Sequence, residues 1–111
     1  MVRAARLRRS GDIALVRAEG RSLRTAAFNA RVRRTTEPGT RLAVIASRAV
    51  GTAVARNRAK RRVREAFRRA LASSGAGPSI DLLITVRPDS LQAGFDALQA
   101  DASTALREAA R

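Results

Sequence analysis

The stretch from Gly51 to Arg69, GTAVARNRAKRRVREAFRR, constrains the fold more than any other part of the sequence. Its last fourteen positions hold eight basic residues and one acidic residue. Small or apolar residues nevertheless recur through it at helical spacing, at Ala59, Val63, Ala66, Phe67 and Ala70. On a helix these positions form a single stripe. The pattern predicts a helix from about Thr52 to Ser73 that packs against the rest of the domain along this stripe.

Half of the eight basic residues of this predicted helix fall on one flank, directly beside the packing stripe. A rigid row of guanidinium groups suits phosphates, which arginine can bind through two parallel hydrogen bonds. A merely solvated face would carry Glu–Arg pairs one turn apart, and only Glu65 is available for that. The helical wheel therefore predicts a nucleic-acid-binding flank made of Asn57, Lys60, Arg61, Arg64 and Arg68, while Arg58, Arg62 and Arg69 face away.

The net charge supports a polyanionic partner. It is +14 for 111 residues, and it is concentrated in residues 1–34 and 56–69. Self-repulsion of this size destabilises a compact chain unless a polyanion offsets it. A generic solubilising charge would be spread more evenly along the chain. A helix that lies on a membrane would need a large apolar flank, which the basic run lacks, so nucleic acid is the predicted partner and a membrane is not.

The residue types that are missing exclude several kinds of site. The sequence has no Cys and no His, which excludes disulfides, a thiolate nucleophile, a histidine base and zinc–thiolate sites. No run approaches the roughly eighteen apolar residues of a membrane span. The basic start, Met1–Ser10, lacks the apolar stretch and cleavage site of a secretory signal. We expect a cytoplasmic protein with no catalytic residue and no metal site of its own.

The remaining pattern predicts one small α+β domain. Two apolar runs flank the long helix, which indicates a β-α-β unit with helices covering one face of a small sheet. A length of 111 residues fits one domain, residues 1–111. The predicted elements are a short helix Ile13–Ala18, a strand with a basic face around Phe28–Val32, strands buried on both faces at Leu42–Ala46 and Ile80–Val86, and a last helix Leu91–Ala109.

One segment resembles a known family. VGTAVARNRAKRRVREAFR, residues 50–68, is similar to the signature of the bacterial ribonuclease P protein subunit. The matching positions are Gly51, Ala53, Arg56, Asn57, Arg58, Lys60, Arg61 and Arg64. Outside it, RLRR at residues 6–9 and RLAVIASRAVG at residues 41–51 also resemble family segments. The resemblance covers most of residues 6–86.

The resemblance implies a division of labour between protein and RNA. In this family a large RNA subunit uses Mg²⁺ to hydrolyse precursor tRNA at the 5′ end of the mature sequence. The protein binds this RNA subunit and the 5′ leader of the precursor; the resemblance implies no cofactor bound by the protein alone and no dedicated protein partner. The implied contacts with the catalytic RNA are Arg56, Asn57, Arg58, Lys60, Arg61, Arg64 and Arg68. The implied leader cleft is lined by Ile13, Arg17, Phe28, Arg31 and Arg48.

The resemblance also implies a fold. It is a three- to four-stranded sheet with three helices, similar to some ribosomal proteins, and its β-α-β crossover has the rare left hand. Residues 1–9 are expected to form a basic, flexible arm. The family usually carries aromatic residues in its cleft, where this chain has Ile13, Arg17 and Arg31. Arginine can stack its guanidinium plane on a base or bind a phosphate instead.

Two other functions share the size and charge of this chain. One is a ribosomal protein or a ribosome-assembly factor, and the Arg-Asn-Arg signature argues against it. The other is nonspecific nucleoid binding, which equal affinity for duplex DNA and for the catalytic RNA would favour. Stimulation of precursor-tRNA cleavage by the RNA subunit distinguishes the first hypothesis from both.

Overall fold

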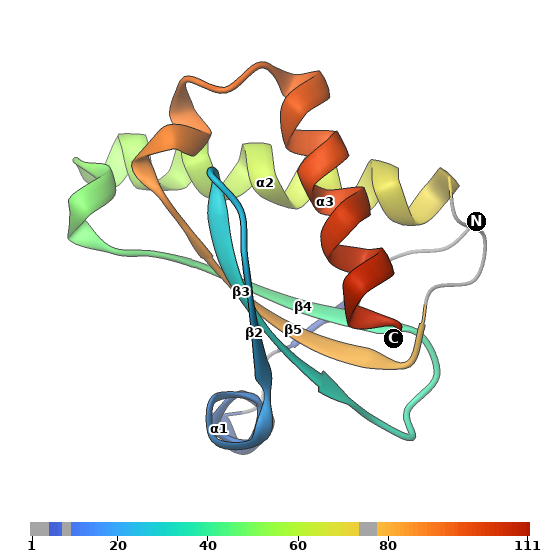
Figure 1. Cartoon of the computed structure of the whole chain (residues 1–111). Helices are drawn as coiled ribbons and strands as arrows, with labels where there is room; N and C mark the ends of the chain where they lie inside the picture. Colours follow the sequence, from blue (N-terminus) through green and yellow to red (C-terminus); the bar gives the residue numbers. More distant parts are fainter. Residues whose placement is uncertain (1–4, 8–9, 74–77) are drawn as a thin grey trace.

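The structure, a computed structural model, describes residues 5–7, 10–73 and 78–111. Its strands build one sheet, and its helices lie on both faces of that sheet (Figure 1). In chain order the elements are β1 (Ala5–Arg6), α1 (Ser10–Glu19), β2 (Arg21–Arg24), β3 (Phe28–Arg34), β4 (Thr40–Ala46), the short 3₁₀ helix η1 (Arg48–Val50), α2 (Ala53–Ser73), β5 (Ile80–Val86), the 3₁₀ helix η2 (Pro88–Leu91) and α3 (Phe95–Ala109).

The sheet is mixed and has the strand order β1-β4-β5-β3-β2. Strand β5 pairs in parallel with β4 and antiparallel with β3, and α2 connects β4 to β5. This confirms the predicted β-α-β unit. Four strands and three helices match the prediction, and β1 adds a two-residue strand at the edge. The left hand of the crossover stays a prediction from the family resemblance.

The helices cover both faces of the sheet, and the expectation that they cover only one is wrong. Helices α2 and α3 lie on one face, while α1 crosses the opposite face (Figure 1). The physical reason is β5, whose side chains are buried on both faces and so need cover on each. On the α1 side Val16 packs with Leu7 and Leu83 in a small second cluster. The space between α1 and the sheet is the place where a cleft can form.

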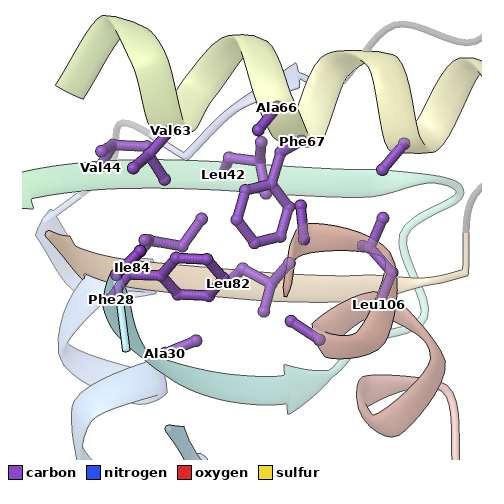
Figure 2. Close-up of a cluster of buried hydrophobic side chains, with 14 of the residues drawn as sticks. Phe28, Ala30, Leu42, Val44, Val63, Ala66, Phe67, Leu82, Ile84 and Leu106 are labelled. Carbon is purple, nitrogen blue, oxygen red and sulfur yellow. The ribbon is translucent and has the colours of Figure 1, made fainter. Parts of the chain in front are cut away.

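The main core lies between the sheet and helices α2 and α3. The predicted stripe of α2 is buried at all five positions, and each is at most 2% exposed. Phe67 of the stripe meets Phe28 of β3 with ring centroids 5.2 Å apart (Figure 2). Because the stripe fixes the rotation of α2 about its axis, the neighbouring flank of the helix is turned away from the core.

Several boundaries differ from the prediction. Leu42–Ala46 is not buried on both faces, because Ile45 is 37% exposed where α1 does not cover the sheet. The last helix begins at Phe95, since Pro88 starts a 3₁₀ turn before it. Strand β2 was not predicted, because its side chains are mostly exposed and show no alternation.

The N-terminal segment is partly ordered. Arg6 belongs to β1, and Leu7 is only 4% exposed, so the prediction of a flexible arm is wrong for residues 5–7. The backbone N–H of Leu7 donates to the carbonyl of Leu42, which ties this segment to β4. The rest of the predicted arm, residues 1–4 and 8–9, lies outside the described residues.

Candidate nucleic-acid interface

The first candidate surface is the basic flank of α2. The chain turns into this helix at Gly51, whose φ of +131° favours glycine. The Thr52 hydroxyl then accepts a hydrogen bond of 3.2 Å from the backbone N–H of Ala55, which satisfies one donor of the first turn. The helix that follows has 21 residues, so it holds the flank on a rigid support.

Three cations of the flank have no counter-ion. Lys60, Arg61 and Arg64 form no ion pair and no side-chain hydrogen bond with any described residue. Arg61 is exposed, and Lys60 and Arg64 are half-buried. Burial lowers the pKa of the Arg64 guanidinium, and the positive charge of Arg6 on β1 lowers it further. Like charges are therefore held close together on this surface, which favours the binding of an anion.

Two residues that were predicted to contact the RNA subunit form hydrogen bonds within the protein itself. Arg56 donates to the carbonyl of Gly51 at 2.9 Å. Arg68 donates from Nε to Glu65 Oε2 at 2.8 Å, and a second, shorter contact joins its Nη2 to Oε1. These hydrogen bonds from Arg68 are the main reason that the pKa of Glu65 lies below its usual value. Arg56 and Arg68 are thus available for an anion only in part, whereas Asn57 and Arg58 are exposed.

Arg62 and Arg69 lie off the packing stripe, as predicted, but both are used inside the protein. Arg62 donates to the carbonyls of Ser90, Leu91 and Ala93 at 2.5–3.0 Å. The guanidinium of Arg69 lies over the ring of Phe95, 4.7 Å from its centroid. Both side chains fasten the start of α3 to α2, so they support the surface without belonging to it.

The second candidate surface is a hollow of about 230 Å³ on the α1 side of the sheet. We call it the α1-side hollow. Its lining comes from α1, β2, β3 and β5 and consists of Arg17, Ser22, Leu23, Arg24, Asn29, Ala30, Arg31, Leu83 and Thr85. The predicted cleft residues Arg17 and Arg31 both belong to it. The structure therefore brings together part of the predicted leader cleft.

Arg31 has a structural task at this hollow. It donates to the carbonyl of Gly20 at 2.5 Å and to that of Val16 at 3.5 Å, at the end of α1. It also donates to the Ser22 hydroxyl of β2 at 2.9 Å. A cation at a helix C-terminus is favourable because the last carbonyls lack partners within the helix. Arg17, by contrast, is exposed and has no partner among the described residues.

Three predicted cleft residues do not line the hollow. Phe28 faces α2 and is 1% exposed, because alternation along β3 points its neighbour Asn29 to the α1 side. Ile13 packs beneath α1 against the Leu7–Val16–Leu83 cluster. Arg48 is exposed in η1, beyond the end of β4. The structure therefore does not bring these three residues into this hollow, and their contact with a leader stays a prediction.

The sequence reasoning missed other lining residues, chiefly Asn29, Thr85 and Arg24. The alternation along β3 is visible in the sequence, and it places Asn29 on the face opposite to the core. The side-chain Oδ1 of Asn29 is buried and has no hydrogen-bond partner in the structure. Thr85 and Arg24 lie in register with Asn29 on the two neighbouring strands.

The carboxylates next to α1 are engaged by arginines. Arg41 donates to both oxygens of Asp81 at 2.7 Å and reaches Asp12 at 3.4 Å. The hydrogen bonds to Asp81 are the main cause of the raised pKa of Arg41. Arg33 pairs with Glu19 at 2.9 Å.

Neither a metal-binding cluster nor a membrane-spanning helix is found in the described ranges. No group of three or more His, Cys, Asp or Glu residues there could hold a metal ion. No helix within the described part of the chain is long and apolar enough to cross a membrane.

Comparison with known proteins agrees with this geometry. The family model Ribonuclease P matches residues 1–110. A curated relative, the ribonuclease P protein component of Chloroflexus aggregans, is 44% identical over 110 residues, which are 98% of this chain and 80% of the relative. The ribonuclease P protein of Thermotoga maritima superposes with a TM-score of 0.78 at 28% identity, covering 93% of this chain and 96% of that one.

A further solved structure shares the fold. The ribonuclease P protein of Staphylococcus aureus gives a TM-score of 0.77 at 22% identity, covering 96% of each chain. The family match extends over nearly the whole sequence, and the basic α2 flank lies in the segment that resembles the family signature. The chain belongs to the ribonuclease P protein family.

Proposed function

We propose that the α2 flank binds the catalytic RNA subunit of ribonuclease P, and that the α1-side hollow binds the 5′ leader of precursor tRNA. The residues of α2 proposed to contact the RNA subunit, on the flank and beside it, are Arg56, Asn57, Arg58, Lys60, Arg61, Arg64 and Arg68. In the hollow, Arg17 is the proposed contact and Arg31 holds its wall in place. Together these sites would position a precursor for removal of its leader.

One observation carries this proposal: Lys60, Arg61 and Arg64 of the α2 flank lack partners among the described residues, whereas several arginines elsewhere are held by carboxylates or carbonyl oxygens of the protein. Arg33 and Arg41 pair with carboxylates, and Arg21 and Arg34 donate to carbonyl oxygens at the end of α3. Lys60, Arg61 and Arg64 have no such partner in the described ranges. Three cations that the fold holds together without an internal anion favour an external one, and phosphate groups of RNA fit them.

We infer that hydrolysis belongs to the RNA subunit and its Mg²⁺ ions, and that this chain contributes binding. The sequence has no His or Cys to act as a base, nucleophile or metal ligand. The carboxylates near the hollow fit Mg²⁺ poorly, because Asp12, Asp81 and Glu19 already accept hydrogen bonds from arginines. The protein would thus supply cationic surface and position to a reaction carried out by RNA.

The test is cleavage of a precursor tRNA at low Mg²⁺ concentration with four mixtures: RNA subunit alone, protein alone, both together, and neither. We expect the protein to stimulate cleavage by the RNA subunit and to cleave nothing by itself. Cleavage by RNA-free protein would overturn the assignment of catalysis. Equal affinity for duplex DNA and for the RNA subunit would overturn specific binding by the α2 flank and favour nonspecific nucleoid binding.

The alternative function is that of a ribosomal protein or a ribosome-assembly factor. The match of the family model to residues 1–110 does not favour it. A pull-down from cell extract distinguishes the two, since a ribosomal role predicts co-sedimentation with ribosomal subunits.

A further inference from the structure

Helix α1 carries its two acidic residues on one side. Asp12 and Glu19 are seven positions apart, which is close to two helical turns, so their side chains project in nearly the same direction. Val16, which lies between them in the sequence, is buried against the sheet. Arg17 is turned about 100° further round the axis from Val16, away from the two acids. The acids and Arg17 therefore lie on opposite flanks of α1.

The face of the sheet beneath α1 presents side chains in rows that run across the strands. Arg33, Asp81 and Arg41 are register partners on β3, β5 and β4 and form one such row, which we call the arginine row. Along β5 the same face continues with Leu83 and then Thr85, because the side chains of a strand alternate. Leu83 packs against α1, and Thr85 lines the α1-side hollow. Helix α1 therefore lies between the arginine row and the hollow.

The arginine row holds both ends of α1 by its acidic flank. Near the beginning of the helix, Arg41 Nη1 lies 3.4 Å from Asp12 Oδ2. At the last residue of the helix, the Nε of Arg33 donates to Glu19 Oε1 at 2.9 Å. Arg17, on the other flank, lines the hollow. The two ion pairs thus hold α1 from the side away from the hollow, while the opposite flank of the helix forms one of its walls.

Apolar packing contributes less to the position of α1 than to that of the other two α-helices. Val16 is the one buried residue among the ten of α1, whereas α2 buries six residues and α3 five. A contact this narrow lets a helix shift along the strands while it exposes little apolar surface. Arg31 also donates to the Gly20 carbonyl, which fastens the C-terminal end of α1 above the row of Leu83. Polar contacts therefore decide where α1 lies along the strands.

We propose that Arg33 and Arg41 set the width of the α1-side hollow, because they fix, through Glu19 and Asp12, how far α1 stands from the arginine row. Both are positioning residues, since they contact α1 on the flank away from the hollow and do not line it. The inference rests on the proposed function of the hollow and names what controls the shape of that site. When either pair opens, α1 moves more freely and the hollow loses its fixed width.

Salt should affect α1 and the rest of the protein in opposite directions. The four side chains of the two pairs are between 24% and 55% exposed, so dissolved ions screen their attraction. The same ions screen the repulsion within a chain of net charge +14, which stabilises the fold as a whole. Raising the sodium chloride concentration should therefore speed hydrogen exchange at the amides of α1 and leave exchange in α2 and β5 unchanged or slower.

The first experiment measures amide hydrogen exchange of the free protein by NMR at low and at high salt. Glu19→Gln and Asp12→Asn each remove one pair. Glu108→Gln is the matched control, because it removes a carboxylate from a similar pair with Arg111 outside α1. At low salt each of the first two variants should speed exchange in α1 about two- to fivefold and weaken its dependence on salt. The control should leave exchange in α1 unchanged.

Two further comparisons separate the ion pair from other effects of the substitutions. A negative charge in the last turn of a helix opposes the helix dipole, so without its pair Glu19→Gln would slow exchange in α1 instead of speeding it. Arg33→Lys keeps a cation beside Glu19 and should preserve part of the protection that Arg33→Met loses. Unchanged exchange with Glu19→Gln and Asp12→Asn would overturn the inference. Equally fast exchange in the Lys and Met variants would mean that packing of the Arg33 stem holds α1, which overturns it as well.

The second experiment measures the preference of the reconstituted holoenzyme for precursor over mature tRNA. Glu19→Gln should lower this preference about two- to fivefold and leave the affinity for the RNA subunit unchanged, whereas loss of a negative charge alone would raise the preference. If exchange in α1 speeds up and the preference stays the same, the pairs hold α1 without setting the hollow, and the inference is overturned. If the unaltered holoenzyme shows no preference, the proposed function of the hollow fails, while the exchange experiment still decides whether the pairs position α1.

Discussion

Arg41 and Asp81 face each other on neighbouring strands, and the guanidinium of Arg41 donates two hydrogen bonds of 2.7 Å to the carboxylate of Asp81. The Asp81 side chain is 1% exposed, so it has no water to replace this partner. This buried pair lies on the α1 side of the sheet and also draws in Asp12 of α1. It therefore joins α1 to β4 and β5.

Removal of the Arg41 side chain should be strongly destabilising. Arg41→Ala leaves a buried carboxylate unpaired, and we expect the free energy of unfolding to fall by about 3 kcal/mol in urea denaturation. Replacing both partners, Arg41→Met with Asp81→Leu, should recover most of this stability, because no buried charge remains. A double variant as unstable as the single one would show that the pair is not the cause.

Removing a cation from the α2 flank should weaken RNA binding without lowering the stability of the protein. Lys60→Ala, Arg61→Ala and Arg64→Ala should each weaken binding of the RNA subunit and lower the salt slope of binding by about 0.7–0.9 for each phosphate that is no longer bound. Circular dichroism should show an intact helix, since alanine has the highest helix propensity and these positions lie off the packing stripe. Arg107→Ala is the control for removal of one charge. Unchanged salt slopes in all three variants would contradict binding to phosphates.

Glu65 should restrain binding by the flank. Glu65→Gln removes the carboxylate that holds Arg68, so we expect tighter binding of the RNA subunit and a steeper salt dependence. The change should also remove one acid-sensitive contribution to stability. Hydrogen bonds from Arg68 lower the pKa of Glu65 in the folded protein, so this contribution is present above the unfolded pKa and is lost as the pH falls through the folded one.

The measurement for Glu65 is the melting temperature of both proteins from neutral pH down to below the ordinary glutamate pKa of 4.5. The two curves should differ by a constant amount at neutral pH and approach each other in acid. Parallel curves throughout would mean that the Glu65–Arg68 pair contributes nothing to stability.

Arg17 and Arg31 should behave differently although both line the hollow. Arg17→Ala should keep the fold and the affinity for the RNA subunit, and should reduce the preference for precursor over mature tRNA by about tenfold if a base stacks on it. Arg31→Ala should destabilise the protein by about 1–2 kcal/mol, because the Gly20 carbonyl at the end of α1 loses its charged donor, while the Val16 carbonyl keeps the backbone N–H of Gly20. Measuring both tRNA affinities and the unfolding free energy separates the two roles. An equal decrease in stability in both variants would contradict them.

The sequence predicts an element correctly where its pattern of apolar residues is compatible with only one way of packing. The stripe of α2 is such a case, since apolar residues at helical spacing within a basic run can be buried in only one way. The apolar run of β5 is another, and its side chains are buried on both faces. The position of α1 could not be predicted in this way, because its buried residue Val16 gives too weak a periodicity to show which face of the sheet it covers.

The candidate sites were harder to predict, because the sequence does not show which partner a charged side chain will contact in the folded protein. Arg62 and Arg61 are neighbours of the same type, yet one holds three carbonyls of the α2–α3 connection and the other is exposed without a partner among the described residues. The two arginines differ because the carbonyls that bind Arg62 come from residues about thirty positions further along the chain, and Arg61 points away from them. Phe28 was placed in the cleft by resemblance, while the alternation of its own strand assigns it to the core.

The parallel pairing of β4 with β5 has a consequence for the order of folding. These strands are separated in the chain by the whole of α2, so they meet only after that segment has crossed the sheet. Closing such a long connection is slow. The connecting segment also carries eight basic residues and one acidic residue between positions 56 and 69, and these like charges repel one another. An anion that neutralises the α2 flank would therefore favour the folded state, in which this segment is helical and the two strands are paired.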